Sequence, residues 1–137
     1  MIKTKIGHIQ FNVHPQNLQF YKDLFAFTGW RTLEDSSIML GVGPSVYDSL
    51  WFFGGANKAT NDYDGCGMNH LALQAQSQGD VDQMAEYLRE QKIAPLFGTP
   101  CHRPDFSQDA EHTYYQVMFE SPDRILFEVV YMGPLEK

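Results

Sequence analysis

Two histidines and one glutamate stand in strand-like segments of the sequence. His8 lies in KIGHIQFNV, His70 in GMNHLALQA and Glu128 in ILFEVVYM, which is otherwise uncharged. An ionised carboxylate on a buried strand is costly unless it is paired or bound to a metal, so Glu128 is expected to have a cationic partner. Two imidazoles and a carboxylate suit one divalent ion such as Zn, Fe, Ni, Mn or Co. The three residues form a candidate metal site if the fold brings their segments together.

A long stretch without periodicity, GTPCHRPDFSQDAEHT at residues 98–113, supplies further polar candidates. A loop of this length in a small domain is typical of a functional or mobile segment, and a lid over the metal is expected here. A plain solvated loop is the alternative. The candidate catalytic groups in and beside this stretch are His102, His112 and Tyr115, and the candidate substrate-binding groups are Arg103 and Tyr114.

Residues next to the histidines could also contact a substrate. Gln10 and Gln74 follow the two histidines on the same strand face. They are expected to touch substrate or to orient ligands, or else simply to line a cavity. Trp51, in the apolar segment SLWFFGG, is a further candidate for substrate binding.

An internal repeat organises the chain, because KIGHIQFNV is echoed by GMNHLALQA with a histidine at the matching place. Each copy is followed by apolar residues at helical spacing, which predicts helices near 16–28 and 80–92. Pro15 suits the first turn, Gly29 suits a C-terminal cap, and Asp80 with Gln83 resembles a capping box. The predicted strands behind the helices are Trp30–Leu33, Ile38–Val42, Leu50–Phe53, Pro95–Phe97, Tyr114–Phe119 and Ile125–Met132.

The sequence therefore predicts an α+β fold of two tandem βαβββ modules within a single domain over residues 1–137. Module one covers about 1–58 and module two about 66–133, joined by the Gly-, Asn- and Asp-rich linker Gly54–Gly67. In each module the alternation of the first strand puts the histidine on the face that points away from the helix.

Composition excludes several classes of function. The formal net charge of −7 opposes nucleic-acid binding, which depends on an excess of Lys and Arg. The N-terminal segment lacks a signal-peptide pattern and no apolar run approaches about 20 residues, so a cytoplasmic protein without a membrane span is expected. Cys66 and Cys101 lack metal-binding or redox spacing and are interpreted as reduced thiols.

Four segments of the sequence resemble the vicinal oxygen chelate superfamily, which includes glyoxalase I, bleomycin-resistance proteins, fosfomycin-resistance thiol transferases and extradiol dioxygenases. The segments are GHIQFNV, FYKDLFAFTGW, NHLALQA and YYQVMFESPDRILFEVV, the last with SPDR in place of the commoner DPDG turn. The resemblance implies a curved, partly open mixed-sheet barrel with helices outside. It also implies a homodimer, sometimes with exchanged modules, and exposed sheet edges favour pairing as well.

In such proteins the metal ligands come from the first and last strands of each module, which points to His8, His70 and Glu128 here. The fourth position lacks a carboxylate, because the last strand of module one offers Trp51, Phe52 or Phe53. The expected function is a metal-dependent enzyme acting on a small oxygen-bearing substrate, of the lyase or isomerase type or the ring-cleaving dioxygenase type. The alternative is a metal-free protein that sequesters an aromatic or antibiotic ligand.

Overall fold

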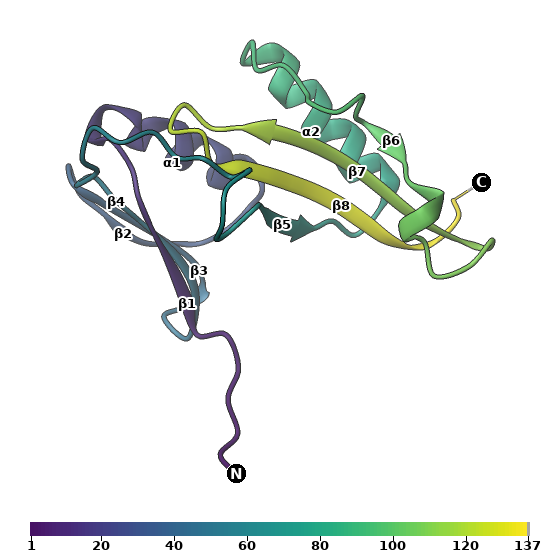
Figure 1. Ribbon diagram of the computed structural model, residues 1–137, viewed down its shortest axis with the longest axis horizontal. Helices are drawn as coiled ribbons and strands as arrows, with labels where there is room; N and C mark the ends of the chain where they lie inside the picture. The colour runs from purple at the N-terminus through teal and green to yellow at the C-terminus, as the bar shows by residue number, and fades with distance from the viewer. Residues whose placement is uncertain (137) are drawn as a thin grey trace. The chain divides into compact units, whose positions relative to one another are not determined.

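The chain forms two compact units, which divide between Thr60 and Asn61 in a computed structural model that describes residues 1–136. Each unit contains one helix of more than two turns and its own four-stranded mixed sheet (Figure 1). The α+β class and the two tandem βαβββ modules predicted from the sequence are confirmed. No helix within residues 1–136 has the length and apolar character needed to cross a membrane.

The first unit begins with a strand that returns to pair with the last strand of the same unit. Its elements are β1 (His8–Asn12), the 3₁₀ turn η1 (Pro15–Asn17), α1 (Leu18–Phe27), β2 (Thr32–Asp35), β3 (Met39–Ser45) and β4 (Asp48–Phe53). The strand order is β1-β4-β3-β2, with β1 parallel to β4 and the other pairs antiparallel. This crossover through α1 covers one face of the sheet with the helix.

An aromatic cluster fixes α1 on the sheet of the first unit. The ring of Phe52 lies 4.4 Å from that of Tyr21, 5.2 Å from that of Phe11 and 5.6 Å from that of Phe25, measured between centroids. All four side chains are buried. Because side chains alternate along a strand, His8, Gln10 and Trp51 belong to the opposite face. The helix ends at Phe27 with Thr28 as its cap, and Gly29 follows as predicted with a φ of +77°, which glycine adopts without strain.

The second unit repeats this plan. Its elements are β5 (Leu71–Gln74), α2 (Gln78–Glu90), β6 (Cys101–His102), the 3₁₀ turn η2 (Pro104–Phe106), β7 (His112–Glu120) and β8 (Leu126–Pro134). The order β5-β8-β7-β6 matches that of the first sheet, and β5 is parallel to β8. Val81, Met84 and Leu88 form the buried face of α2.

Two local predictions in this unit were wrong. The cap of α2 is Ser77, whose Oγ accepts a hydrogen bond from the Asp80 backbone N–H at 3.0 Å, so Asp80 lies inside the helix. The second strand of the unit is not Pro95–Phe97, because Phe97 and Gly98 both have positive φ and turn the chain. It is β6, which lies within the stretch predicted to be loop and pairs with Gln116 and Tyr115 of β7.

Candidate functional site

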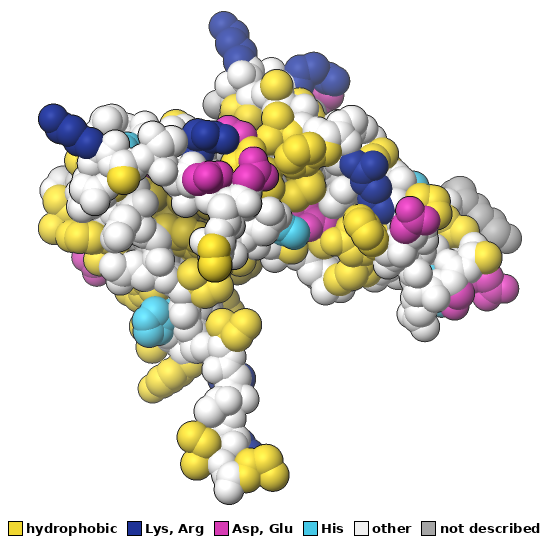
Figure 2. Space-filling view, viewed as in Figure 1, with side chains coloured by type: hydrophobic (Ala, Val, Ile, Leu, Met, Phe, Trp, Pro, Cys, Tyr) yellow, Lys and Arg dark blue, Asp and Glu magenta, His cyan; other side chains and the backbone are white. Residues whose placement is uncertain are grey.

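A cavity of about 520 Å³ opens on the face of the second sheet that points away from α2. Its polar wall contains His70, Glu128, Gln116 and Arg103. Figure 2 shows histidine and acidic side chains next to one another amid hydrophobic ones, in the part of the surface over β5 and β8. The cavity therefore combines a few converging polar groups with apolar walls, as small-molecule sites do.

Glu128 is the centre of this polar group, although its side chain is only 1% exposed. Its Oε1 accepts hydrogen bonds from the Tyr114 hydroxyl at 2.5 Å and from Gln116 Nε2 at 2.8 Å. Its Oε2 lies 2.9 Å from Nε2 of His70. One carboxylate oxygen is thus occupied by two donors, and the other is turned to the histidine. These partners offset the cost of burying the carboxylate.

Burial and the neighbouring Glu128 raise the pKa of the Tyr114 phenol from 10.0 to about 12. Ionising the phenol would place a second negative charge against the carboxylate and remove the hydrogen bond. Tyr114 therefore remains a hydrogen-bond donor throughout the neutral range and holds Glu128 in position.

The residue before His70 determines which of its ring nitrogens carries hydrogen. Asn69 Nδ2 donates to the backbone carbonyl of Tyr63 at 3.0 Å, so its Oδ1 is the atom that faces His70 Nδ1 at 2.7 Å. A carbonyl oxygen only accepts, and Nδ1 must therefore donate. Neutral His70 then has its lone pair on Nε2, directed at the Glu128 carboxylate. Two acceptors 2.9 Å apart form an arrangement that suits a cation held by both.

The stretch predicted to be a lid contributes one wall of the cavity. His102, Arg103 and Phe106 line it. Arg103 Nε donates to Gln116 Oε1 at 3.0 Å and Nη2 donates to the Phe97 carbonyl at 2.6 Å, which fixes the guanidinium. The Phe106 ring meets the Tyr114 ring edge to face, with centroids 5.4 Å apart. The loop is therefore tied to the residues that hold Glu128.

In the first unit, His8 is exposed on β1 and lies opposite Ser49 of β4. Gln10, also exposed, lies opposite Trp51, just as Ala72 lies opposite Glu128 in the second unit. Trp51 therefore occupies the position that matches Glu128. Its Nε1 donates to Ser49 Oγ at 2.8 Å, and its ring covers Gly41, where a Cβ would lie 2.5 Å from the ring.

Comparison with known proteins finds no matching family model and no matching curated protein, but many solved structures share the fold. A candidate glyoxalase from Bacillus halodurans is 25% identical with a TM-score of 0.74, over 92% of this chain and 94% of that one. The fosfomycin resistance protein FosX from Listeria monocytogenes, complexed with Mn(II) and sulfate, is 20% identical with a TM-score of 0.67, over 98% and 94%. A glyoxalase/bleomycin resistance protein/dioxygenase from Alicyclobacillus acidocaldarius is 11% identical with a TM-score of 0.62, over 93% and 91%.

The chain has the vicinal oxygen chelate fold. The resemblance recognised in the sequence is therefore confirmed. Of the residues predicted for the site, the cavity in the second unit brings together His70, Glu128, Tyr114, His102 and Arg103.

Other predicted residues lie elsewhere in the vicinal oxygen chelate fold. Tyr115 was expected beside the metal, but its hydroxyl donates to Asp82 of α2 at 2.6 Å, since neighbouring strand residues face opposite ways. His112 pairs with Asp109 at 2.7 Å and lines a separate cavity of about 210 Å³. Gln74 lies at the end of β5 opposite Val130 and is absent from the lining of the larger cavity.

Asn69 and Gln116 are site residues that the sequence did not suggest. Asn69 directly precedes a candidate ligand, and Gln116 follows Tyr114 at the strand spacing of two, so adjacency and alternation were the available signals. Among residues 1–136, no three His, Cys, Asp or Glu side chains gather into a group that could hold a metal. The pair of candidate ligands in the second unit is His70 with Glu128.

Proposed function

We propose that the protein is a metal-dependent enzyme of the glyoxalase and dioxygenase type, acting on a small oxygen-bearing substrate. The single observation that carries this proposal is the pair formed by His70 Nε2 and Glu128 Oε2, 2.9 Å apart in the wall of the cavity. The hydrogen bond from His70 Nδ1 to Asn69 leaves Nε2 as the nitrogen that faces the carboxylate.

The donor set fits a divalent ion. Metal–nitrogen and metal–oxygen distances of about 2.0–2.2 Å place two ligands at a right angle about 3 Å apart, so the pair could take up an ion with little movement. Many metal-binding histidines also donate their other ring nitrogen to an oxygen acceptor, as His70 does to Asn69. When bound, such an ion supplies a Lewis acid that polarises substrate oxygens.

We propose His8 as the third ligand. It occupies the place on β1 that His70 occupies before β5, and its side chain is exposed. His8 belongs to the first unit, and it could come from the same chain or from a second copy.

The chain's other residues have supporting roles in this proposal. Tyr114 and Gln116 donate to Oε1 of Glu128 and keep Oε2 toward His70. Arg103 keeps further N–H groups for an anionic substrate oxygen, because within residues 1–136 only its Nε and one hydrogen of Nη2 are engaged, by Gln116 and Phe97. Phe106 contacts the ring of Tyr114 edge to face and gives this wall of the cavity an apolar surface.

Metal content tests the proposal directly. Protein purified without added metal is analysed for its elements and then titrated with Mn²⁺. Glu128→Gln is expected to lower Mn²⁺ affinity by more than about 100-fold, because loss of a ligand exceeds the 10- to 100-fold cost of losing an outer partner. Glu136→Gln, which changes an exposed carboxylate of the same unit, is the matched control and should leave affinity unchanged. Equal affinities in both variants would reject the metal site.

The metal found also separates the reaction types. Iron favours a dioxygenase, whereas zinc or nickel favours a lyase or isomerase. A fosfomycin-type reaction is less favoured, because Arg103 is the one Lys or Arg that lines the cavity among the described residues 1–136.

Sequestration of an aromatic ligand is the second candidate function. Phe97 and Phe106 line the cavity and remain 57% and 64% exposed, which is unusual for side chains of this type. Protein that contains no metal, and that binds an aromatic ligand equally well after Glu128→Gln, would favour sequestration over catalysis.

A further inference from the structure

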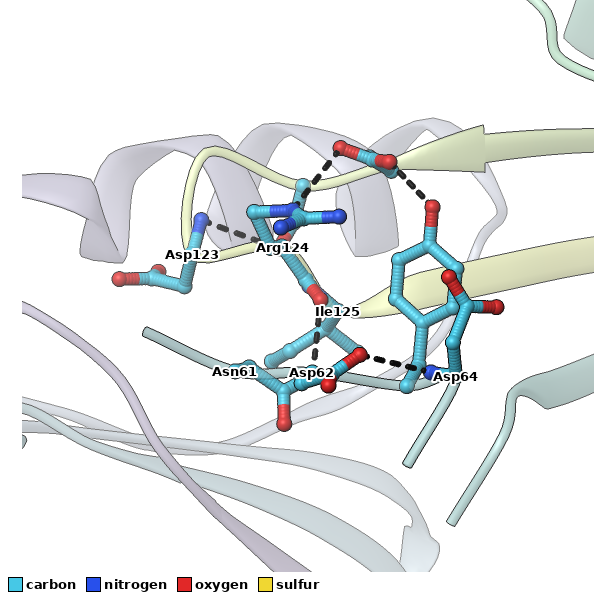
Figure 3. Close-up of polar contacts among 9 residues, drawn as sticks. Asn61, Asp62, Asp64, Asp123, Arg124 and Ile125 are labelled. Carbon is cyan, nitrogen blue, oxygen red and sulfur yellow. Dashed lines mark hydrogen bonds and ion pairs between the residues drawn. The ribbon is translucent and has the colours of Figure 1, made fainter. Parts of the chain in front are cut away.

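The segment at residues 61–64, which begins the second unit, contacts the turn between β7 and β8. Asn61 Nδ2 donates to the Arg124 carbonyl at 2.8 Å, and the Asp64 N–H donates to Asp62 Oδ1 at 3.0 Å (Figure 3). The Tyr63 hydroxyl donates to Oε1 of Glu120, and the Arg124 guanidinium lies 5.4 Å from the centre of the Tyr63 ring. Tyr63 is thus held by Glu120 at the end of β7 and by Arg124 in the turn that follows.

Packing holds the Tyr63 ring from the other side. The side chain is 7% exposed and lies against Met118 and Leu126, with Leu96 beside them. Met118 and Leu126 also line the cavity. The hydrogen bond to Glu120 raises the pKa of the Tyr63 phenol, so the hydroxyl stays a donor. Composition indicated a linker here, yet residue 63 belongs to the core beneath the site.

A continuous line of contacts leads from this anchor to the candidate ligand. The Tyr63 carbonyl accepts from Asn69 Nδ2 at 3.0 Å, Asn69 Oδ1 accepts from His70 Nδ1 at 2.7 Å, and His70 Nε2 lies 2.9 Å from Glu128 Oε2. A free asparagine amide can present either its oxygen or its nitrogen. The carbonyl of a fixed residue removes that choice, because only the NH₂ group can donate to it.

We propose that Tyr63 is a positioning residue for His70, held by Glu120 and Arg124 so that its carbonyl orients the Asn69 amide and thereby keeps hydrogen on His70 Nδ1. The inference rests on the proposed function only where it concerns metal affinity. The protonation of Nδ1 is a property of the metal-free chain.

Two asparagine variants test the orientation of the histidine. ¹⁵N-labelled, metal-free protein is examined by ¹H–¹⁵N correlation at a pH where free imidazole is neutral, and His70→Gln identifies the His70 signals. We expect hydrogen on Nδ1 in the unaltered protein and in Asn69→Asp, which keeps an acceptor. Asn69→Leu should lose that signal. Hydrogen absent from Nδ1 in the unaltered protein, or retained in Asn69→Leu, would overturn the inference.

The effect of this positioning on metal binding is tested by measuring Mn²⁺ affinity with electron paramagnetic resonance. Asn69→Leu is expected to bind about 10- to 100-fold more weakly, as for other outer-shell partners, while Asn69→Asp stays close to the unaltered protein. Tyr63→Phe removes the hydroxyl anchored on Glu120 and should lower affinity by a smaller factor and broaden the Mn²⁺ spectrum.

Tyr115→Phe is the matched control, because it deletes a phenol that also donates to a carboxylate, but on the α2 side of the sheet. It should change neither readout. Equal effects of Tyr63→Phe and Tyr115→Phe would reject a positioning role for Tyr63. An unaltered protein that binds no Mn²⁺ would reject the proposed function alone, because the nuclear magnetic resonance measurement still decides the orientation of His70.

Discussion

Glu128 and Tyr114 show how far the role of a single residue could be predicted from the sequence. An acidic residue in an uncharged strand indicated a buried, paired carboxylate, and the structure pairs Glu128 with His70. Tyr115 was predicted as a catalytic residue and Tyr114 as a substrate-binding residue, but strand alternation allows only one of two neighbours to face the cavity. Choosing between them requires the register of β7 on β8, where Met118 lies opposite Glu128. That register depends on pairing between distant segments, which the local pattern does not contain.

The raised pKa of Tyr114 leads to a prediction of how the free energy of unfolding changes at alkaline pH. Its pKa is raised from 10.0 to about 12, so the unfolded chain loses this proton before the folded chain does. The stabilisation is complete below pH 10.0 and declines as pH rises toward about 12. In Tyr114→Phe the loss of stability across this window should be shallower, as measured by urea denaturation at stepped pH.

Phenolate absorbance of the folded protein gives an independent check on the same group. One late-ionising tyrosine should disappear from the titration in Tyr114→Phe. Other late tyrosines remain in that variant, because the hydrogen bond to Asp82 raises the pKa of Tyr115 to about 12 and the hydrogen bond to Glu120 raises the pKa of Tyr63. Titration of Tyr114 in the ordinary range near 10 would contradict its contact with Glu128.

Helices were predicted better than strands. The helical spacing located α1 and α2 to within about two residues, the usual uncertainty at helix ends. The segment Pro95–Phe97 was predicted as a strand, yet Phe97 has a φ of +57°, a conformation that is rare for a bulky side chain. Tertiary contacts hold it, among them the bond from Arg103 to its carbonyl. Neither composition nor periodicity contains that information.

The start of α2 gives a prediction that separates the two candidate caps. Ser77→Ala should destabilise the protein by about 1 kcal/mol, because the Asp80 N–H loses its side-chain acceptor. Asp80→Ala should cost less, since Asp80 contributes only a charge in the first turn. Urea denaturation of both variants makes the comparison, and a larger cost for Asp80→Ala would restore the capping box predicted from the sequence.

At the scale of the whole molecule, the duplication leaves two sheets with two edge strands each. These are β1 and β2 in the first unit and β5 and β6 in the second. Edge strands favour pairing with another strand, which supports the proposal that the protein is a homodimer. Sedimentation at micromolar concentration is expected to give twice the chain mass of 15.7 kDa. A species of the single-chain mass would reject the dimer.

Mixing two variants determines which chain supplies His8. His8→Ala and Glu128→Gln are unfolded together and refolded, so that half of the dimers are mixed. If each metal site draws ligands from both chains, a mixed dimer has one intact site, and about a quarter of the sites recover Mn²⁺ binding. If each site uses one chain, the mixture binds no better than the separate variants.

Trp51, at the position that matches Glu128, also affects how the molecule can be observed. The chain has two tryptophans, and both Trp30 and Trp51 belong to the first unit, whereas five of the seven tyrosines follow residue 60. Intrinsic tryptophan emission therefore reports on the first module, which has Trp51 in place of Glu128. Absorbance changes from tyrosine ionisation come mainly from the second module, which contains Glu128. Because of this divergence between the two copies, tryptophan emission follows the unfolding of the first module alone, whereas the tyrosine signal of the unmodified chain reports mainly on the second.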